Sequence, residues 1–208
     1  MAFCNLDKCI YYGVGKYDFP DLEPFNEELP SHWIRFTDIK NFPLNQNVGV
    51  HFFQNDAKFE AIWNRPNKYI DKFKKIGVLV QPDFSVYTDF PRAVQIYNKY
   101  RNHWLARFYS DRGIKVLPFV MWSTPDNYDW CFDGTPKNST VSITTNGTIN
   151  DKESHNYFLL GYEEMIKRLN PKKIIVFTVT DKTELIGISG DNIKFVNCAV
   201  RKTLKAEG

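Results

Sequence analysis

Residues 78–121 read VLVQPDFSVYTDFPRAVQIYNKYRNHWLARFYSDRGIKVLPFVM, and this stretch decides the fold. Val78–Val80 predicts a short buried strand, and Ile114–Met121 predicts a second strand that is apolar on both faces. Between the two strands, Asp89 as the N-cap and Pro91 in the first turn predict a long helix with apolar residues at the helical period. A strand, a helix and a second strand in this order are typical of a parallel, right-handed crossover.

The same alternation of strands and helices continues on both sides of this unit. Further strands are predicted at Val48–Phe53, Thr140–Thr145, Lys173–Thr178 and near Ile193–Val196. Further helices are predicted over Lys152–Leu169 and from Phe59 to Phe73, the latter with a break at Pro66. The fold class is therefore α/β, with about six strands, alternating helices and an irregular N-terminal arm. The strands are expected to form either a mostly parallel sheet or a partial TIM-like barrel.

The length of 208 residues fits one domain with an appendage at each end. Residues 1–45 are predicted to form an extended arm that packs on the domain and holds one or two short strands. Four prolines interrupt any regular pattern there, namely Pro20, Pro24, Pro30 and Pro43. Residues 46–200 are expected to form a single α/β domain, and residues 201–208 a polar tail.

Composition excludes several classes of protein. With 43% hydrophobic and 25% charged residues, and no apolar run of about 18 residues, the chain is typical of a globular protein that does not enter a membrane. The N-terminus lacks a secretory signal, so we expect a cytoplasmic protein. We therefore expect free thiols at Cys4, Cys9, Cys131 and Cys198. The net charge of +3 is far below the basic excess of proteins that follow a phosphate backbone.

Common catalytic motifs are missing from the sequence. We find no phosphate-binding loop, dinucleotide-binding glycine turn, paired-histidine zinc motif or Gly-x-Ser-x-Gly turn. ATPase, dehydrogenase and serine hydrolase functions are therefore unsupported, and we expect neither a cofactor nor a metal. Aromatic residues reach 16%, which indicates extensive core packing or a surface that stacks bases or contacts a partner.

Several longer motifs occur in an order and spacing that is specific to one protein family. They include Val50-His51-Phe52-Phe53, Lys58-Phe59-Glu60, Trp63-Asn64-Arg65-Pro66, Pro82-Asp83-Phe84-Ser85, Gln95-Ile96-Tyr97-Asn98 and Cys131-Phe132-Asp133-Gly134. From Val48 to Thr178, the chain resembles a family of bacterial, phage and mobile-element proteins known as domain of unknown function 4417. The resemblance implies a phage, prophage or plasmid setting. It implies no chemistry, because the family has no assigned activity.

The chain departs from the pattern of this family in two places. Gln54-Asn55-Asp56 stands where relatives usually show paired acids, which argues against a role that needs two carboxylates there. Phe177-Thr178-Val179-Thr180 lacks the expected Tyr-Gly pattern, so a site at that strand end is expected to be altered.

Ligands of parallel sheets and barrels bind at the carboxyl ends of the strands, where loops meet helix N-termini. The polar and aromatic residues predicted there are Gln54, Asn55, Asp56, Asp83, Ser85, Trp122, Ser123, Thr145, Asn146 and Thr178. Asp83 is a candidate catalytic residue, as a general base or an orienting carboxylate, with Ser85 beside it and Trp122 as an apolar wall. Asn146 is a further candidate ligand-binding residue. The alternative for Asp83 and Ser85 is a turn in which both bond the local backbone.

The predicted helix after Asp89 supplies a second group of candidates. Arg101 is a candidate catalytic residue that would bind a phosphate or carboxylate, and Asn98 and Asn102 are candidate ligand-binding residues on a common helix face. If this face is covered, these side chains and that of Gln95 need partners. The alternative for Arg101 is a salt bridge to Asp83, Asp89 or Asp133.

Asp133 is the third candidate catalytic residue, in a turn where Gly134 is expected to supply an unusual backbone angle. Two functional hypotheses remain. One is a phage or mobile-element protein that binds a host or defence protein, or a nucleic acid, through an aromatic-rich surface. The other is a small α/β enzyme that acts on a nucleotide, nucleic acid or related metabolite at the strand ends. A concave pocket that gathers the candidate residues favours the enzyme.

Overall fold

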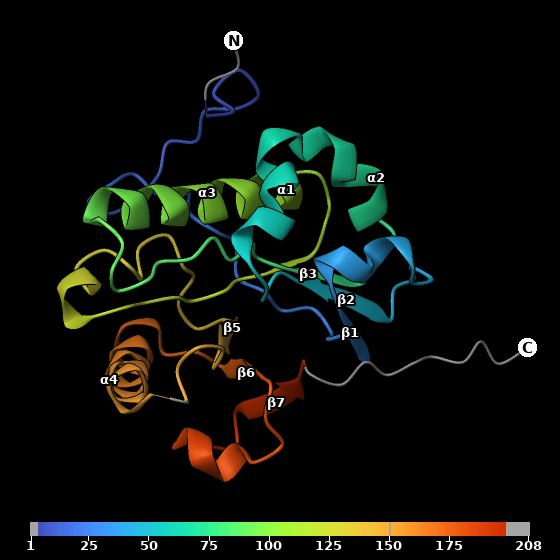
Figure 1. Ribbon diagram of the computed structural model, residues 1–208. Coiled ribbons are helices and arrows are strands. Elements are labelled where there is room, and N and C mark those ends of the chain that lie inside the picture. The colour runs from blue at the N-terminus through green and yellow to red at the C-terminus, as the bar shows by residue number, and fades with distance from the viewer. Residues whose placement is uncertain (1–3, 150, 199–208) are drawn as a thin grey trace, which may run out of the picture.

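The computed structural model describes residues 4–149 and 151–198 (Figure 1). In chain order the strands are β1 (His32–Arg35), β2 (Val48–His51), β3 (Val78–Val80), β4 (Val116–Leu117), β5 (Thr140–Thr144), β6 (Lys173–Thr178) and β7 (Ile193–Asn197). The α-helices are α1 (Glu60–Asn64), α2 (Ile70–Phe73), α3 (Arg92–Ser110) and α4 (Lys152–Leu169). The polar tail predicted at residues 201–208 lies outside the described residues.

Each strand pairs in parallel with the next strand of the chain, in the orders β1-β2-β3-β4 and β5-β6-β7. The two sheets are joined because the Val120 N–H donates to Ser142 O at 2.8 Å and the Ser142 N–H donates to Pro118 O at 2.7 Å. The seven strands thus follow one another in space as they do in the wall of a barrel. No ladder joins β7 to β1 within the described residues, so this wall stays open.

The α/β class with a parallel sheet is confirmed. The strand number is seven rather than about six, because β1 lies within the first 45 residues and pairs with β2 over four residues. The strand predicted over Ile114–Met121 is regular only at β4. Its ladder with β3 ends where Pro118 has no N–H to donate, and the next N–H, that of Phe119, donates to Gln81 Oε1 at 2.9 Å.

The predicted helices are found, with one corrected boundary. The break at Pro66 is confirmed, since a 3₁₀ turn over Pro66–Tyr69 separates α1 from α2. Helix α3 begins at Arg92 with Pro91 in the N-cap position, so the prediction of Asp89 as the N-cap is wrong. Proline disfavours the helical conformation in the residue before it, and Phe90 therefore cannot belong to the first turn.

Apolar side chains fill three clusters around the sheet. Helices α1, α2 and α3 gather over β1–β4, and α4 lies beside β5–β7 (Figure 1). Phe52, Phe59 and Trp104 belong to the cluster under the first group of helices, and Met165 belongs to the cluster under α4. A third cluster joins the strands themselves, for example through Phe177, and it lies beneath the carboxyl ends of the strands.

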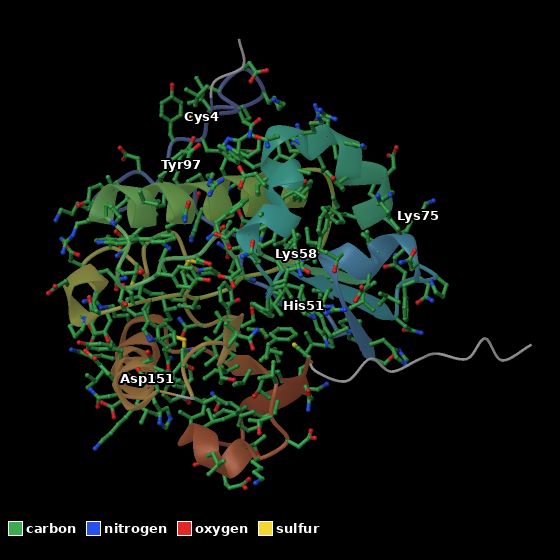
Figure 2. The ribbon with its side chains drawn as sticks, viewed as in Figure 1. Cys4, His51, Lys58, Lys75, Tyr97 and Asp151 are labelled. Atoms are coloured by element: carbon green, nitrogen blue, oxygen red, sulfur yellow. The ribbon has the colours of Figure 1, made fainter. Side chains whose placement is uncertain are left out.

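The segment before β1 bonds to the helices that cover the sheet. The Asn5 amide donates to Trp63 O at 2.8 Å, and Trp104 Nε1 donates to Cys9 O at 3.1 Å. Figure 2 shows Cys4 beside Tyr97, whose hydroxyl lies 3.7 Å from Cys4 Sγ. None of the helices in the described part of the chain is long and apolar enough to cross a membrane.

Candidate functional site

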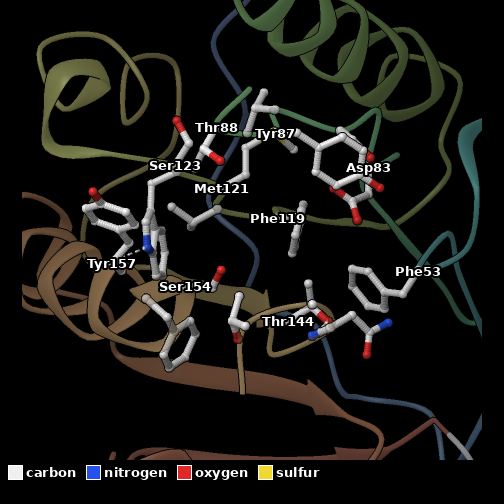
Figure 3. A pocket seen from close by; sticks show the side chains of 18 of the residues that line it. Phe53, Asp83, Tyr87, Thr88, Phe119, Met121, Ser123, Thr144, Ser154 and Tyr157 are labelled. Atoms are coloured by element: carbon white, nitrogen blue, oxygen red, sulfur yellow. Dashed lines mark hydrogen bonds between the residues drawn. The ribbon is translucent and has the colours of Figure 1, made fainter. Parts of the chain in front are cut away.

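A pocket of about 360 Å³ opens at the carboxyl ends of four neighbouring strands. Its wall is formed by residues that end or follow β2, β3, β4 and β5 and by the first turns of α4. The polar and aromatic residues of this wall are Phe53, Gln54, Asp83, Ser85, Tyr87, Thr88, Phe119, Trp122, Ser123, Thr144, Asn146, Thr148, Ser154, Tyr157 and Phe158. Figure 3 shows Asp83 and Phe53 on one side of this pocket and Tyr157 and Ser154 on the opposite side. Parallel strands bring residues from distant parts of the chain to one edge, and here that edge is concave.

Aromatic rings form the apolar part of the pocket. Phe53 and Phe119 lie with ring centroids 5.1 Å apart, and Trp122 lies 5.8 Å from Phe158 of α4. Trp122 Nε1 also donates to Tyr157 O at 3.2 Å. The indole rests on Gly161, where an added Cβ atom would overlap the ring. Because Gly161 has no side chain, the Trp122 indole can pack closely against the middle of α4.

Asp83 is the pocket's only acidic residue among those described, and its carboxylate has no hydrogen-bond or ion-pair partner among the described residues. Burial raises the pKa of Asp83 well above its ordinary value, and the nearby Asp56 carboxylate raises it further. Such a carboxyl keeps its proton at a pH where an exposed aspartate has lost it. The turn in which Asp83 bonds its local backbone is not formed.

Asp56 holds the pocket segment that carries Ser85. Its carboxylate accepts from the Ser85 N–H at 3.0 Å and from Ser85 Oγ at 2.9 Å. The side chain that caps the short 3₁₀ helix after β2 is Asn55, which accepts from the Ala57 N–H. The Asp56 carboxylate thus accepts two hydrogen bonds and fixes Ser85, whereas the Asp83 carboxylate has no such bond.

Three amide side chains on one face of α3 hold the segment after Asp83 against the helix. Asn102 binds both backbone groups of Phe84, since it accepts from the N–H at 2.8 Å and donates to the carbonyl at 2.9 Å. Asn98 donates to Ser85 O at 2.6 Å, and Gln95 donates to Tyr87 O at 3.0 Å. Asn98 and Asn102 do not line the pocket. We call Gln95, Asn98 and Asn102 the amide face of α3.

Arg101 is buried beside this face and pairs with Glu60, not with an aspartate of the predicted set. Its Nη1 donates to Glu60 Oε1 at 2.9 Å, and its Nη2 donates to Asn98 Oδ1 at 2.7 Å. The guanidinium lies 3.7 Å from the ring centre of Phe84. The structure therefore places Arg101 in a link between α3 and α1, away from the pocket wall.

Asp133 also lies away from the pocket. Its turn is as expected, with Gly134 at φ 74°, but the carboxylate accepts from the Lys16 N–H at 3.2 Å. Asp133 lines a second hollow together with two other carboxylates, of which Glu164 pairs with Arg168 and Asp21 with Arg107. All three carboxylates of this second hollow thus already have protein partners.

Two further polar atoms of the pocket residues lack partners. Gln54 Oε1 accepts from Thr37 Oγ1 at 3.0 Å, which leaves Gln54 Nε2 buried and unpaired. Asn146 Oδ1 is likewise buried and unpaired. Among the described lining residues none is Lys, Arg or His. Over residues 4–149 and 151–198, no three His, Cys, Asp or Glu side chains are grouped so as to hold a metal ion.

Of the predicted site residues, the pocket gathers Asp83, Ser85, Trp122 and Asn146. The expectation that ligands bind at the carboxyl ends of the strands also pointed to Gln54 and Ser123, and both residues line the pocket. Sequence reasoning missed Phe53, Phe119, Met121, Ser154 and Tyr157 as lining residues. The signal for Phe53 and Phe119 was their position at strand ends, and the signal for Ser154 was its place in the first turn of a predicted helix.

Comparisons with known proteins find a matching family and two similar phage proteins. The model of a family described as "Domain of unknown function (DUF4417)" matches residues 11–188. The "Gene 1 protein" of Mycobacterium phage L5 is 34% identical over 163 residues, which span 77% of this chain and 71% of that protein. The "Gene 1 protein" of Mycobacterium phage D29 is 32% identical over 167 residues, which span 77% of this chain and 60% of that protein. No solved structure matches the chain.

Proposed function

The chain belongs to the family described as "Domain of unknown function (DUF4417)", and we propose that it is a small α/β enzyme with Asp83 as its acid–base group. Its substrate is a nucleotide, nucleic acid or related metabolite that enters the pocket at the strand ends. The observation that carries this proposal is the unpartnered carboxyl of Asp83 in an aromatic pocket. Elsewhere in the fold, the buried guanidinium of Arg101 is paired with Glu60.

The chemistry follows from the state of Asp83. A carboxyl whose pKa is raised by burial can give its proton to a bound ligand at a pH where an exposed aspartate has none to give, and take it back as a carboxylate. Asp56 and the amide face of α3 act as positioning residues, because they fix the backbone of residues 84–87 next to Asp83. Phe53, Phe119 and Trp122 exclude water from the apolar side of a ligand.

Incubation with a metabolite extract from a bacterial host tests this proposal. We expect wild-type protein to deplete a metabolite and to release a product, both followed by mass spectrometry. Asp83→Asn keeps the shape of the side chain and cannot exchange its proton, so it should still bind the metabolite but not convert it. Thr88→Trp, at the exposed mouth of the pocket, should abolish both steps.

Asp71→Asn provides a matched control, since Asp71 is an exposed aspartate on α2 outside the pocket. It should convert the metabolite as wild type does. An extract that wild type and Asp83→Asn change equally, or that neither changes, would contradict the enzyme proposal.

A second candidate function rests on the N-terminal segment. Leu6, Ile10, Tyr12 and Val14 are exposed, and Tyr12 has 93% of its surface exposed. Neighbouring exposed apolar side chains of this kind favour contact with a partner protein, which in a phage setting is a host or defence protein. The double variant Ile10→Ser and Tyr12→Ser should lose a stoichiometric partner in affinity purification from the host. A partner retained by this variant would contradict this second function.

A further inference from the structure

We propose that the pocket binds a planar heterocycle with an amino group beside a ring nitrogen, the edge shared by adenine and cytosine, and leaves any phosphate outside. This inference rests on the proposed function, because it names the part of the ligand that the same pocket recognises. It is carried by unpartnered polar atoms on three side chains, by the aromatic wall and by the lack of a cation among the described lining residues.

The polar groups of the pocket are complementary to this edge. A protonated carboxyl at Asp83 offers one O–H donor and one carbonyl acceptor, which match a ring nitrogen and the neighbouring amino group. Burial raises the pKa of Asp83, which favours this protonated form. Gln54 Nε2 is a donor without an acceptor, and Asn146 Oδ1 is an acceptor without a donor. Buried polar groups in folded proteins are usually paired. Two buried unpaired atoms and the half-buried, unpartnered carboxyl of Asp83 line one cavity, so a ligand there can complete all three.

The charge of the wall excludes a buried phosphate. A phosphate in a pocket needs Lys, Arg or a metal to offset the cost of removing its charge from water. The described lining residues include no such cation and do include Asp83, which would repel an anion once ionised. A volume of about 360 Å³ is near the lower end for small-molecule sites, which suits one ring system with its substituents.

The aromatic wall supplies the stacking surface for such a ring. Phe53 and Phe119 lie on the side of Asp83, and Tyr157 lies across the pocket from them (Figure 3). Bases stack on aromatic side chains with a gain of about 1–3 kcal/mol per base. The wall therefore gives affinity for any flat ring, and the three polar groups decide which edge is accepted.

Calorimetric titration of the full chain with adenosine, purine riboside and adenosine 5′-monophosphate tests the inference. Purine riboside lacks the amino group and leaves the Asp83 carbonyl oxygen without a donor, so we expect it to bind at least about tenfold more weakly than adenosine. The monophosphate should bind within about threefold of adenosine, because no lining cation attracts its phosphate. Asp83→Leu should reduce adenosine binding to the level of purine riboside. Asp83→Asn should retain the preference, since a carboxamide also offers a donor and an acceptor.

Asp71→Leu on α2 is the matched control and should bind as wild type does. Equal affinities for adenosine and purine riboside, a monophosphate bound at least about tenfold more tightly, or no nucleoside binding at about 5 mM would each overturn the inference. Different results would contradict the proposed ligand class and the proposed enzyme. Conversion of another metabolite in the extract without nucleoside binding would remove only the ligand class. The expected nucleoside preference without any conversion would remove only the enzyme.

Discussion

The two sides of the segment that follows β3 carry polar side chains in opposite states. Toward α3, the amide face bonds backbone groups of residues 84–90, and Asn102 alone satisfies both groups of Phe84. Toward the pocket, Asp83 has no partner, and Gln54 Nε2 and Asn146 Oδ1 are buried without one. The segment after β3 thus lies between α3, whose amide side chains are hydrogen-bonded to it, and the pocket, where several polar atoms have no partner.

The difference distinguishes polar side chains that stabilise the fold from polar side chains that are available to a ligand. Asn98 and Asn102 have the residue types of a ligand site, but they bond the backbone within the fold, and Arg101 is held away from the pocket by Glu60 and Asn98 through its two Nη atoms. Asp83 is available to a ligand because the chain leaves it unbonded in a cavity. Substitutions on the bonded side should therefore cost stability, whereas those on the unbonded side should change binding and chemistry.

Asn102→Ala is expected to have the largest effect on stability. It leaves the buried N–H and carbonyl of Phe84 unpaired, which should lower the free energy of unfolding by roughly 2–4 kcal/mol. Urea denaturation followed by tryptophan fluorescence measures this change. Asn67→Ala, at an exposed asparagine between α1 and α2, is the control and should change stability by less than about 0.5 kcal/mol. Equal losses of the free energy of unfolding in Asn102→Ala and Asn67→Ala would contradict the assignment of Asn102 to the hydrogen-bonded side.

Arg101→Met should have a smaller effect of the same sign. The methionine keeps contact with Phe84 but leaves Asn98 Oδ1 unpaired and Glu60 without its cation, at a cost of about 1–2 kcal/mol. Arg107→Met on the same helix removes a more exposed ion pair to Asp111 and should cost less than about 1 kcal/mol. Ligand binding should persist in Arg101→Met. A folded variant that cannot bind would place Arg101 in the site.

Asp83→Asn should have the smallest effect, with the opposite sign and a defined pH dependence. The pKa of Asp83 is raised in the folded protein, so the unfolded chain releases its proton first as the pH rises. Wild type should therefore lose stability as the pH rises above about 4, up to the folded-state pKa of Asp83. The variant lacks this loss, so it should be the more stable protein at pH 7 by urea denaturation. A stability difference that stays constant from pH 4 to pH 7 would contradict this.

The sequence predicted those parts of the site that depend on chain order alone. Parallel strands put Asp83, Trp122 and Asn146 at carboxyl ends, and the pocket gathers all three. Asp133 follows β4 as well, but it lies late in the long connection to β5, where it contacts the Lys16 backbone. The rule holds only for residues close to the strand end.

Partners across the fold could not be predicted in the same way. The pattern showed that Gln95, Asn98 and Asn102 would need partners on a covered helix, but those partners are backbone atoms and have no sequence signature. The shortened β4 depended on Pro118, whose effect on one ladder is clear only once its neighbour strand is known. The seventh strand, β1, lies in the arm that was predicted to hold one or two short strands, but the prolines around it hid its position.

A carbon-13 NMR titration of the Asp83 carboxyl tests the central claim most directly, with Asp83→Asn used to assign the signal. The account predicts a midpoint well above the usual aspartate value of about 4, and a shift of that midpoint when a ligand fills the pocket. A midpoint near 4 that no ligand moves would show a hydrated or paired carboxylate, and would contradict the assignment of Asp83 as the unbonded group of the pocket.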